Sequence, residues 1–204
     1  MGLQAYRGHA DGFACVRKLW PYAQKMGIRF LTLWAFSTEN WKRSPVEVEV
    51  IMTLLEKALK QVSVEMHEKK ARFVVIGRRD RLKPAIVSLI EHIERETMQY
   101  ESFCVTVAID YGGRDEIRRA SEKLRSSGDP SLQIEDFLDT TLAKVPNPDL
   151  IIRTGKEQRL SGFMPLQSEY AELYFTDVLF PQFTTVQFQG ALNEYVRRKR
   201  NFGA

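Results

Sequence analysis

The sequence predicts a single α/β domain with a mostly parallel central sheet ringed by helices. Two observations support this prediction. Short apolar runs typical of buried strands alternate with amphipathic stretches of helical period. The chain of 204 residues is also long enough to bury a sizeable core, and no repeat or low-complexity segment divides it. We therefore treat residues 1–204 as one domain.

The first elements are expected between residues 12 and 66. Apolar residues at helical spacing predict a helix over 12–26, which Pro21 would kink or end early. The mostly apolar run at 28–36 predicts a buried parallel strand. Ser44, Pro45 and Glu47 form a helix start with the pattern of a capping box. An apolar stripe then predicts a long helix; its members are Val48, Met52, Leu55, Leu59, Val62 and Met66.

The remaining elements follow the same alternation. Strands are expected at 72–76, 103–109, 150–152 and 173–175, and helices at 84–98, from 114 onward, after the loop at 126–130, and at 187–200.

Composition excludes some classes of protein and favours none strongly. The chain is 44% hydrophobic and 27% charged, with no apolar run long enough for a membrane-spanning helix and no signal peptide. Cys15 and Cys104 lack the spacing of metal ligands, which favours a reduced cytoplasmic protein. The net charge of +4 is mild.

Chemically useful residues fall at the ends of the expected strands. Ser37, Asn40, Asp110 and Arg153 lie at or just past strand ends, and Glu172 borders another strand. Ligands of parallel α/β sheets bind beyond the carboxyl ends of the strands. These residues are therefore expected to share a site.

The loop after Arg153 has the residue types of an anion site. Arg153 and Arg159 offer forked donors that match phosphate oxygens, and Ser161 adds a hydroxyl. An ordinary polar loop with surface arginines explains the same residues about as well. Glu172 stands in an apolar run, where a carboxylate is costly unless it is paired or binds a metal such as Mg²⁺. The alternative is a carboxylate at a strand edge that faces solvent.

The segment after residue 36 adds a second group of candidates. Ser37, Asn40 and Arg43 follow a strand, and Phe36 and Trp41 would flank an apolar ligand or, as the simpler alternative, pack in the core. His9, next to a helix start, is the other candidate, although a lone histidine is more often structural. No Walker or dinucleotide-binding glycine motif, hydrolase elbow or nucleic-acid platform is present.

Several motifs in one order resemble the cis-prenyltransferases, the undecaprenyl diphosphate synthase family. The resemblance extends from about Gly8 to Gly203, and it rests on Gly8-His9 with Gly12, on LTLWAFSTENW at 31–41 with Arg43, on YGGR at 111–114, on Arg153-Thr154-Gly155 with Glu157, Arg159 and Ser161, and on YAELYF at 170–175.

The resemblance implies an activity and a set of partners. Isopentenyl diphosphate units would extend an allylic diphosphate, usually farnesyl diphosphate, with cis double bonds and with Mg²⁺ as cofactor. The fold would enclose an apolar tunnel for the growing chain, and the protein would be a homodimer. A product this apolar would allow transient membrane contact by a cytoplasmic enzyme. No nucleic acid partner is implied, and product length stays open.

The resemblance also assigns roles to residues. Arg153, Arg159 and Ser161 would hold isopentenyl diphosphate, and Glu172, from its own or a partner subunit, would bind Mg²⁺. The other substrate-handling positions would be Ser37, Asn40, Arg43, Trp41 and Phe36, with His9 near the diphosphates.

The sequence departs from the family pattern in ways that matter. The family's first strand ends in an Asp-Gly-Asn motif that the 204 residues do not contain, so the domain is expected to lack that strand. Lys156, Leu166 and Asn201 replace a usual glycine, tryptophan and arginine. An alternative function is therefore a non-catalytic subunit that stabilises an active partner.

Overall fold

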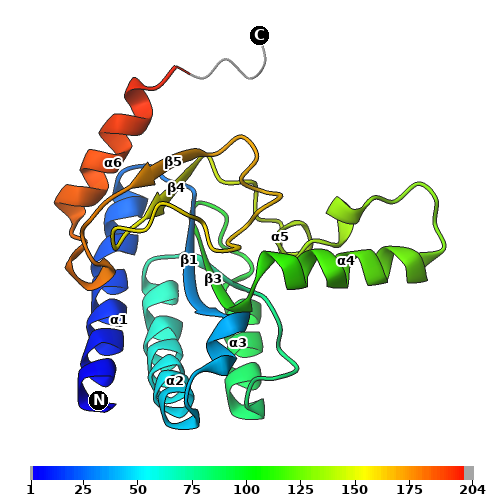
Figure 1. The fold of residues 1–204 in the computed structure, drawn as a ribbon, viewed down its shortest axis with the longest axis horizontal. Helices are drawn as coiled ribbons and strands as arrows, with labels where there is room; N and C mark the ends of the chain where they lie inside the picture. The colour runs from blue at the N-terminus through cyan, green and yellow to red at the C-terminus, as the bar shows by residue number, and fades with distance from the viewer. Residues whose placement is uncertain (1, 200–204) are drawn as a thin grey trace.

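Strands and helices alternate along the chain, as the sequence predicts (Figure 1). The computed structural model describes residues 2–199, apart from the side chains of residues 2–7 and 9. The elements in order are α1 (Gly2–Lys25), β1 (Phe30–Ser37), η1 (Thr38–Lys42), α2 (Pro45–Glu68), β2 (Arg72–Ile76), α3 (Pro84–Thr97), β3 (Cys104–Tyr111), α4 (Gly113–Ser127), η2 (Ile134–Phe137), α5 (Asp139–Leu142), β4 (Leu150–Arg153), β5 (Glu172–Phe175), η3 (Phe180–Gln182) and α6 (Thr185–Arg197).

All strand pairings are parallel, but they form two sheets. One sheet has the order β1-β3-β2, and the other contains β4 and β5. The prediction of parallel strands is therefore confirmed, whereas the single central sheet is divided. β1 runs beside β3 from Phe30, opposite Cys104, to Ser37, opposite Tyr111, with an irregularity after Trp34.

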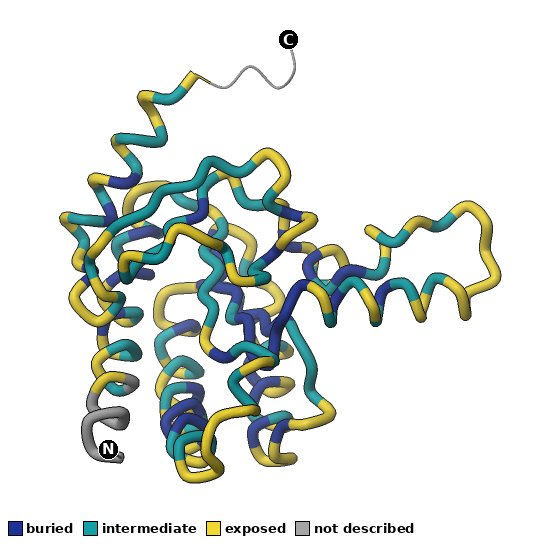
Figure 2. The backbone as a smooth tube through the Cα atoms, viewed as in Figure 1, coloured by how far each residue is buried: buried dark blue, intermediate teal, exposed yellow. Residues whose placement is uncertain are grey.

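The division explains why two strands, β1 and β4, are less buried than predicted. β2 and β3 are almost wholly buried, but in β1 only Phe36 is (Figure 2). The free edge of β1 and β4 line the same pocket of about 660 Å³, together with apolar side chains such as Phe163 and Phe183. In β4, likewise, Ile151 alone is fully buried. The prediction that both strands are buried is wrong because no described strand covers these two edges.

The core lies where α1, α2 and α3 pack against the larger sheet (Figure 1). The predicted stripe on α2 is confirmed: Met52, Leu55, Leu59 and Met66 are buried, and Val48 and Val62 pack partly buried against the core. The Ser44 hydroxyl accepts the Glu47 backbone N–H at 3.3 Å, so the predicted helix start is confirmed as well.

The first helix differs from the prediction. α1 begins ten residues earlier than expected and continues past Pro21 to Lys25. Pro21 falls in the last turns of α1, and the neighbouring Leu19, Trp20 and Ala23 are buried in the core. We infer that this packing outweighs the backbone hydrogen bond that the proline cannot donate.

The open edge of β2 is bonded by side chains. Phe73 N–H donates to Thr97 Oγ1 at 3.0 Å, and Val75 N–H donates to Glu94 at 2.8 Å. Gly77 N–H, just past the strand, donates to Asp139 at 3.1 Å. These caps occupy donors with which another strand would otherwise pair.

Among residues 2–199, no helix combines the length and apolar character that crossing a membrane requires.

Candidate active site

The strand end at Ser37 is shaped by a local cap. Ser37 N–H donates to the Asn40 side-chain oxygen at 2.8 Å, which starts the short helix η1. The Asn40 amide oxygen is thereby engaged, and its NH₂ group remains as a donor. Phe36 is buried and meets Trp41 edge to face, with ring centroids 5.2 Å apart. Arg43, exposed at the end of η1, pairs with Glu47.

A buried ion pair that the sequence does not reveal lies next to this turn. Asp110, fully buried at the end of β3 with a φ of 51°, accepts two bonds from Arg81. The Arg81 guanidinium lies over the Trp41 ring, 5.6 Å from its centroid. Asp110 stands at a predicted strand end, but nothing local in the sequence identifies Arg81 as its partner.

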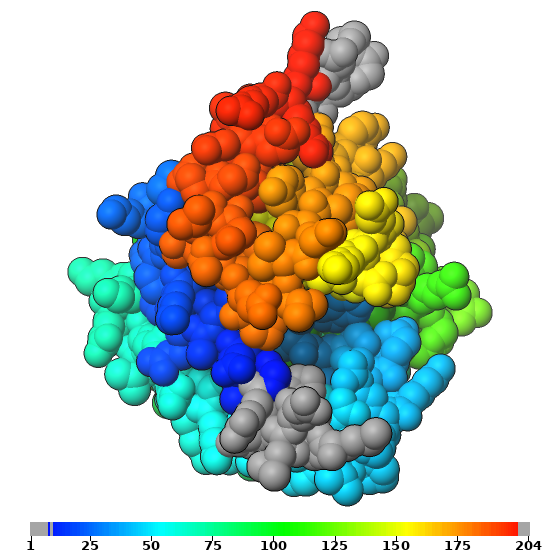
Figure 3. Space-filling model, turned by 60° about the vertical axis from the view of Figure 1, so that its left-hand side comes forward, coloured from blue at the N-terminus to red at the C-terminus, as the bar shows by residue number. Residues whose placement is uncertain are grey.

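The turn after β3 brings the two predicted motifs together. A side chain on Gly112 would collide with Thr38, and one on Gly113 would collide with Pro165. Gly113 N–H also donates to the Gly162 carbonyl at 2.8 Å. The Ser37–Asn40 turn and the loop that carries Ser161 therefore flank the same two glycines. In the space-filling view, a hollow lies between the light-blue segment around η1 and the orange segment after β5 (Figure 3).

Arg153 has a buried donor that a ligand could bond. It ends β4, and its Nε is buried without a hydrogen-bond partner among the described residues. Burying a polar group in this way is unfavourable unless something else bonds to it. Arg159 and Ser161 are exposed on the following loop, and Arg159 pairs with Glu157. Lys156, which replaces the usual glycine, adopts a φ of 67° and is exposed.

Glu172 does not join these residues within the chain. It begins β5 opposite Leu150, whereas Arg153 lies opposite Phe175 at the other end of the strand pair. Three residues of strand separate the two ends by roughly 10 Å. The Glu172 carboxylate instead accepts a hydrogen bond from Arg198 at 2.7 Å. The expectation of a single cluster at strand ends is therefore wrong for Glu172, because it lies at the start of its strand.

The carboxylates present fit a metal only in combination with a ligand. Among the residues whose side chains the structure describes, no three His, Cys, Asp or Glu side chains gather to hold an ion. Glu172 is paired with Arg198 but only partly buried, so it could turn toward an ion, whereas Asp110 is fully buried and bonded twice by Arg81. Mg²⁺ commonly binds through one or two carboxylates plus substrate phosphates and water. The donor set therefore suits Mg²⁺ brought with a diphosphate.

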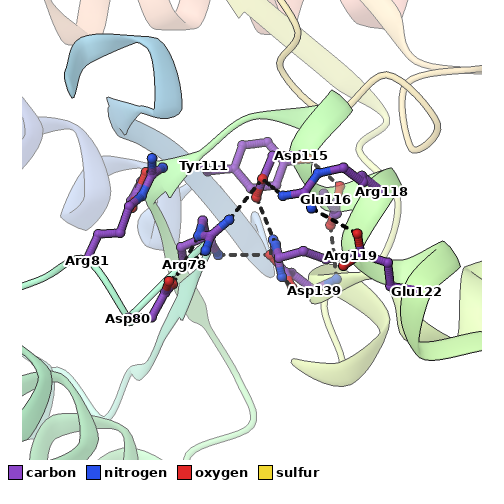
Figure 4. Close-up of polar contacts among 12 residues, drawn as sticks. Arg78, Asp80, Arg81, Tyr111, Asp115, Glu116, Arg118, Arg119, Glu122 and Asp139 are labelled. Carbon is purple, nitrogen blue, oxygen red and sulfur yellow. Dashed lines mark hydrogen bonds and ion pairs between the residues drawn. The ribbon is translucent and has the colours of Figure 1, made fainter. Parts of the chain in front are cut away.

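A network of charges supports the turn after β3 (Figure 4). Burial tends to raise the pKa of Asp115, but hydrogen bonds from Arg119 and Arg118 hold that pKa below its ordinary value. Arg78 also donates to Asp115, at 3.2 Å. Burial and the neighbouring Glu116 carboxylate raise the pKa of Tyr111, so its hydroxyl stays protonated.

The side chains at two of the predicted positions lie outside the described part of the structure. His9 is on α1, and its side chain lies outside the described part of the structure. Asn201 lies beyond the described residues.

The chain matches known proteins over almost its whole length. The family model described as "Putative undecaprenyl diphosphate synthase" matches residues 1–203. An isoprenyl transferase of Aquifex aeolicus is 42% identical over 99% of this chain and 88% of the relative. A tritrans,polycis-undecaprenyl-diphosphate synthase (geranylgeranyl-diphosphate specific) of Pyrococcus abyssi is 39% identical over 96% of this chain and 78% of the relative.

A solved structure agrees with these matches. The crystal structure of lavandulyl diphosphate synthase from Lavandula x intermedia, in complex with dimethylallyl diphosphate, superposes with a TM-score of 0.92 and 32% identity. It covers 98% of this chain and 89% of the other. The order of the motifs, the parallel strands and these matches together show that the chain belongs to the undecaprenyl diphosphate synthase family of prenyltransferases.

Proposed function

We propose that the protein adds isopentenyl diphosphate to an allylic diphosphate, with farnesyl diphosphate as the expected primer, and so makes a polyprenyl diphosphate with cis double bonds. The observation that carries this proposal is the contact between the two motifs across Gly112 and Gly113, beside a strand end at Ser37. This contact brings the turn after β1 and the loop that carries Ser161 against the same two glycines, which supports a shared site. Membership of the family supplies the reaction class.

The reaction makes a carbon–carbon bond and releases diphosphate. The allylic C–O bond breaks, and its electron pair leaves with the diphosphate. The double bond of isopentenyl diphosphate supplies the electrons of the new bond, and loss of a proton forms the new double bond. Donors fixed around the leaving diphosphate stabilise the charge that develops there.

Roles for the arginine loop follow from its chemistry. Arg153 offers a buried Nε with no described partner, which a diphosphate oxygen would satisfy. Arg159 and Ser161 would complete the isopentenyl diphosphate site, with Arg159 leaving Glu157 for the ligand.

The turn after β1 would handle the reacting groups. The free NH₂ of Asn40, the Ser37 hydroxyl and Arg43 would orient the substrates and assist proton removal. Trp41 and Phe36 would border the allylic chain, and His9 would lie near the diphosphates.

Mg²⁺ would enter with the diphosphate and help to neutralise its charge. We propose that Glu172 contributes the protein carboxylate. Because it lies at the far end of the strand pair from Arg153, we further propose that it serves the site of a second copy in a homodimer.

The pocket between β1 and β4 suggests how the sheet would be completed. Both strands present an unpaired edge to it, so one more parallel strand would join the two sheets. We propose that a strand carrying an Asp-Gly-Asn motif occupies this place in the active protein. Its carboxylate would add to the metal site.

Product formation from labelled isopentenyl diphosphate and farnesyl diphosphate tests these proposals. The assay compares the 204-residue chain with a version extended by an Asp-Gly-Asn segment, each with and without Mg²⁺. Mg²⁺-dependent polyprenyl product supports the proposed function, and product from the extended version alone supports the strand. If both versions fold and neither makes product, the protein is a non-catalytic subunit instead.

A further inference from the structure

The loop after β4 holds an unfavourable backbone conformation. Lys156, Ser161 and Met164 are not glycines, yet they adopt φ values of 67°, 53° and 47°. Gly155 and Gly162 have positive φ as well. L-residues in this region store strain, and they keep it only where the surrounding structure fixes them. Ser161, a proposed diphosphate ligand, therefore depends on whatever holds the loop.

One end of the loop is anchored by a buried glutamine. Gln167, only 2% exposed, donates from its side-chain nitrogen to Glu116 at 3.0 Å and to Thr140 at 3.1 Å. Its side-chain oxygen is buried without a described partner. Leaving that oxygen unpaired opposes stability. The two bonds from the nitrogen, rather than burial of the amide, are therefore what this side chain contributes.

Glu116 ties this anchor to the rest of the site. Its buried carboxylate also accepts the Tyr111 hydroxyl at 2.6 Å and the Asp139 backbone N–H at 3.0 Å. In Figure 4 Tyr111, Glu116 and Asp139 lie close together between β3 and α5. One carboxylate thus joins the end of β3, the first turn of α4, the start of α5 and the anchor of the loop.

Contacts within the loop transmit this anchoring toward Ser161. Phe163 stacks on Trp34 with centroids 5.1 Å apart, and Met164 is buried. Ser168 N–H donates to the Met164 carbonyl at 2.9 Å, and Phe163 N–H donates to the Leu160 carbonyl at 2.9 Å. The segment from Leu160 to Ser168 is therefore continuously tied, with Gln167 buried within its last turn.

We propose that Gln167 is a positioning residue for isopentenyl diphosphate: through Glu116 it fixes the strained loop so that Ser161 and its neighbours meet the diphosphate. The proposal rests on the proposed function of this loop. Gln167 itself touches no reacting atom, and its expected effect is on how tightly the diphosphate is bound.

Gln167→Met tests this, because methionine keeps the volume and removes both hydrogen bonds. We expect the KM for isopentenyl diphosphate to rise about ten-fold, while the KM for the allylic diphosphate stays within about two-fold. Hydrogen exchange should become faster in a peptide covering residues 158–166. Inorganic pyrophosphate should bind more weakly by titration calorimetry.

Thr97→Val is the matched control. Thr97 is as buried as Gln167 and accepts the Phe73 N–H, but it lies between α3 and β2. This variant should lose stability and leave both KM values and loop exchange unchanged. Thr140→Val is a milder second variant that keeps the bond to Glu116, with an expected rise in KM for isopentenyl diphosphate of about five-fold.

The proposal is overturned if folded Gln167→Met keeps an unchanged KM for isopentenyl diphosphate and unchanged loop exchange. It is also overturned if Thr97→Val raises that KM and speeds loop exchange as Gln167→Met is expected to do. If Gln167→Met does not fold, an unchanged KM for isopentenyl diphosphate in Thr140→Val overturns it. If the unsubstituted protein forms no product either as the 204-residue chain or with the added Asp-Gly-Asn segment, the proposed function is contradicted instead. The exchange measurement then still decides whether Gln167 fixes the loop.

Discussion

At the scale of single residues, the clearest feature is an arginine whose buried Nε lacks a hydrogen-bond partner among the described residues. Arg153 is held at the end of β4 with its Nε buried and unpaired among the described residues. Most other arginines of the site region have carboxylate partners, for example Arg81 with Asp110 and Arg159 with Glu157. A group buried at such a cost, at a strand end, is expected to meet its partner in a ligand.

Arg153→Ala should therefore lower kcat/KM by about 100-fold or more, because it removes charge-assisted bonds to the diphosphate. Arg153→Lys should recover little, since lysine lacks the forked donors. Steady-state kinetics and circular dichroism check both variants against Arg125→Ala, an exposed arginine in the last turn of α4. Full activity in a folded Arg153→Ala protein would remove Arg153 from the site.

At the scale of elements, a single glycine decides how β2 leaves the sheet. Gly77 has a φ of 111°, and a side chain there would collide with the Ile109 carbonyl of β3. Neither strand backbone can move far, because β2 pairs with β3 from Arg72 to Ile76 and β3 also pairs with β1 on its other edge. Gly128, the cap of α4, also has positive φ, but nothing lies near its missing side chain.

Gly77→Ala should thus destabilise the protein by about 3 kcal/mol, since strain and collision add. Gly128→Ala should cost only about 1 kcal/mol, for the left-handed conformation alone. Urea unfolding measures both. Equal losses in the two variants would show that the contact with β3 contributes nothing.

Asp115, in the first turn of α4, should make the stability of the fold sensitive to acid. Arginine hydrogen bonds hold the pKa of Asp115 below its ordinary value, so this group stabilises the fold above the unfolded-state pKa of about 3.9. That stability is lost as the pH falls through the lower folded-state pKa. Asp115→Asn should cost about 2 kcal/mol at pH 7 and progressively less below pH 4. Urea midpoints from pH 7 to pH 3 test this against Glu101→Gln, and a constant difference would contradict it.

The sequence predicts the elements well where a pattern is local. The stripe on α2, the cap at Ser44 and the strand at 72–76 needed only periodicity and turn chemistry. The sequence does not show which strands pair, so the predicted burial of β1 was wrong. It also missed Arg81 and Gln167, whose partners Asp110 and Glu116 are distant in sequence.

At the scale of the whole molecule, Glu172 stands apart from the other predicted site residues. Thr38 of the turn after β1 and the Ser161 loop meet across Gly112 and Gly113, but Glu172 lies at the opposite end of β5 from the end beside Arg153. Its bond to Arg198 keeps the carboxylate on the side of α6. A carboxylate placed away from its own site serves the reaction most directly in a symmetric dimer.

Complementation tests this arrangement. Arg153→Ala and Glu172→Gln should each be nearly inactive alone. In a mixed dimer, one site then combines both substitutions, and the other combines the intact Arg153 of one copy with the intact Glu172 of its partner. Random mixing makes about half of the dimers mixed, each with one intact site, so about a quarter of wild-type activity should return. If Glu172 serves its own subunit, every site in the mixture carries one substitution, and no activity returns. Mixing after unfolding and refolding ensures that subunits exchange. A parallel mixture of Glu169→Gln with Arg153→Ala is the control, because its mixed dimers carry a substitution in only one site whichever subunit Glu172 serves.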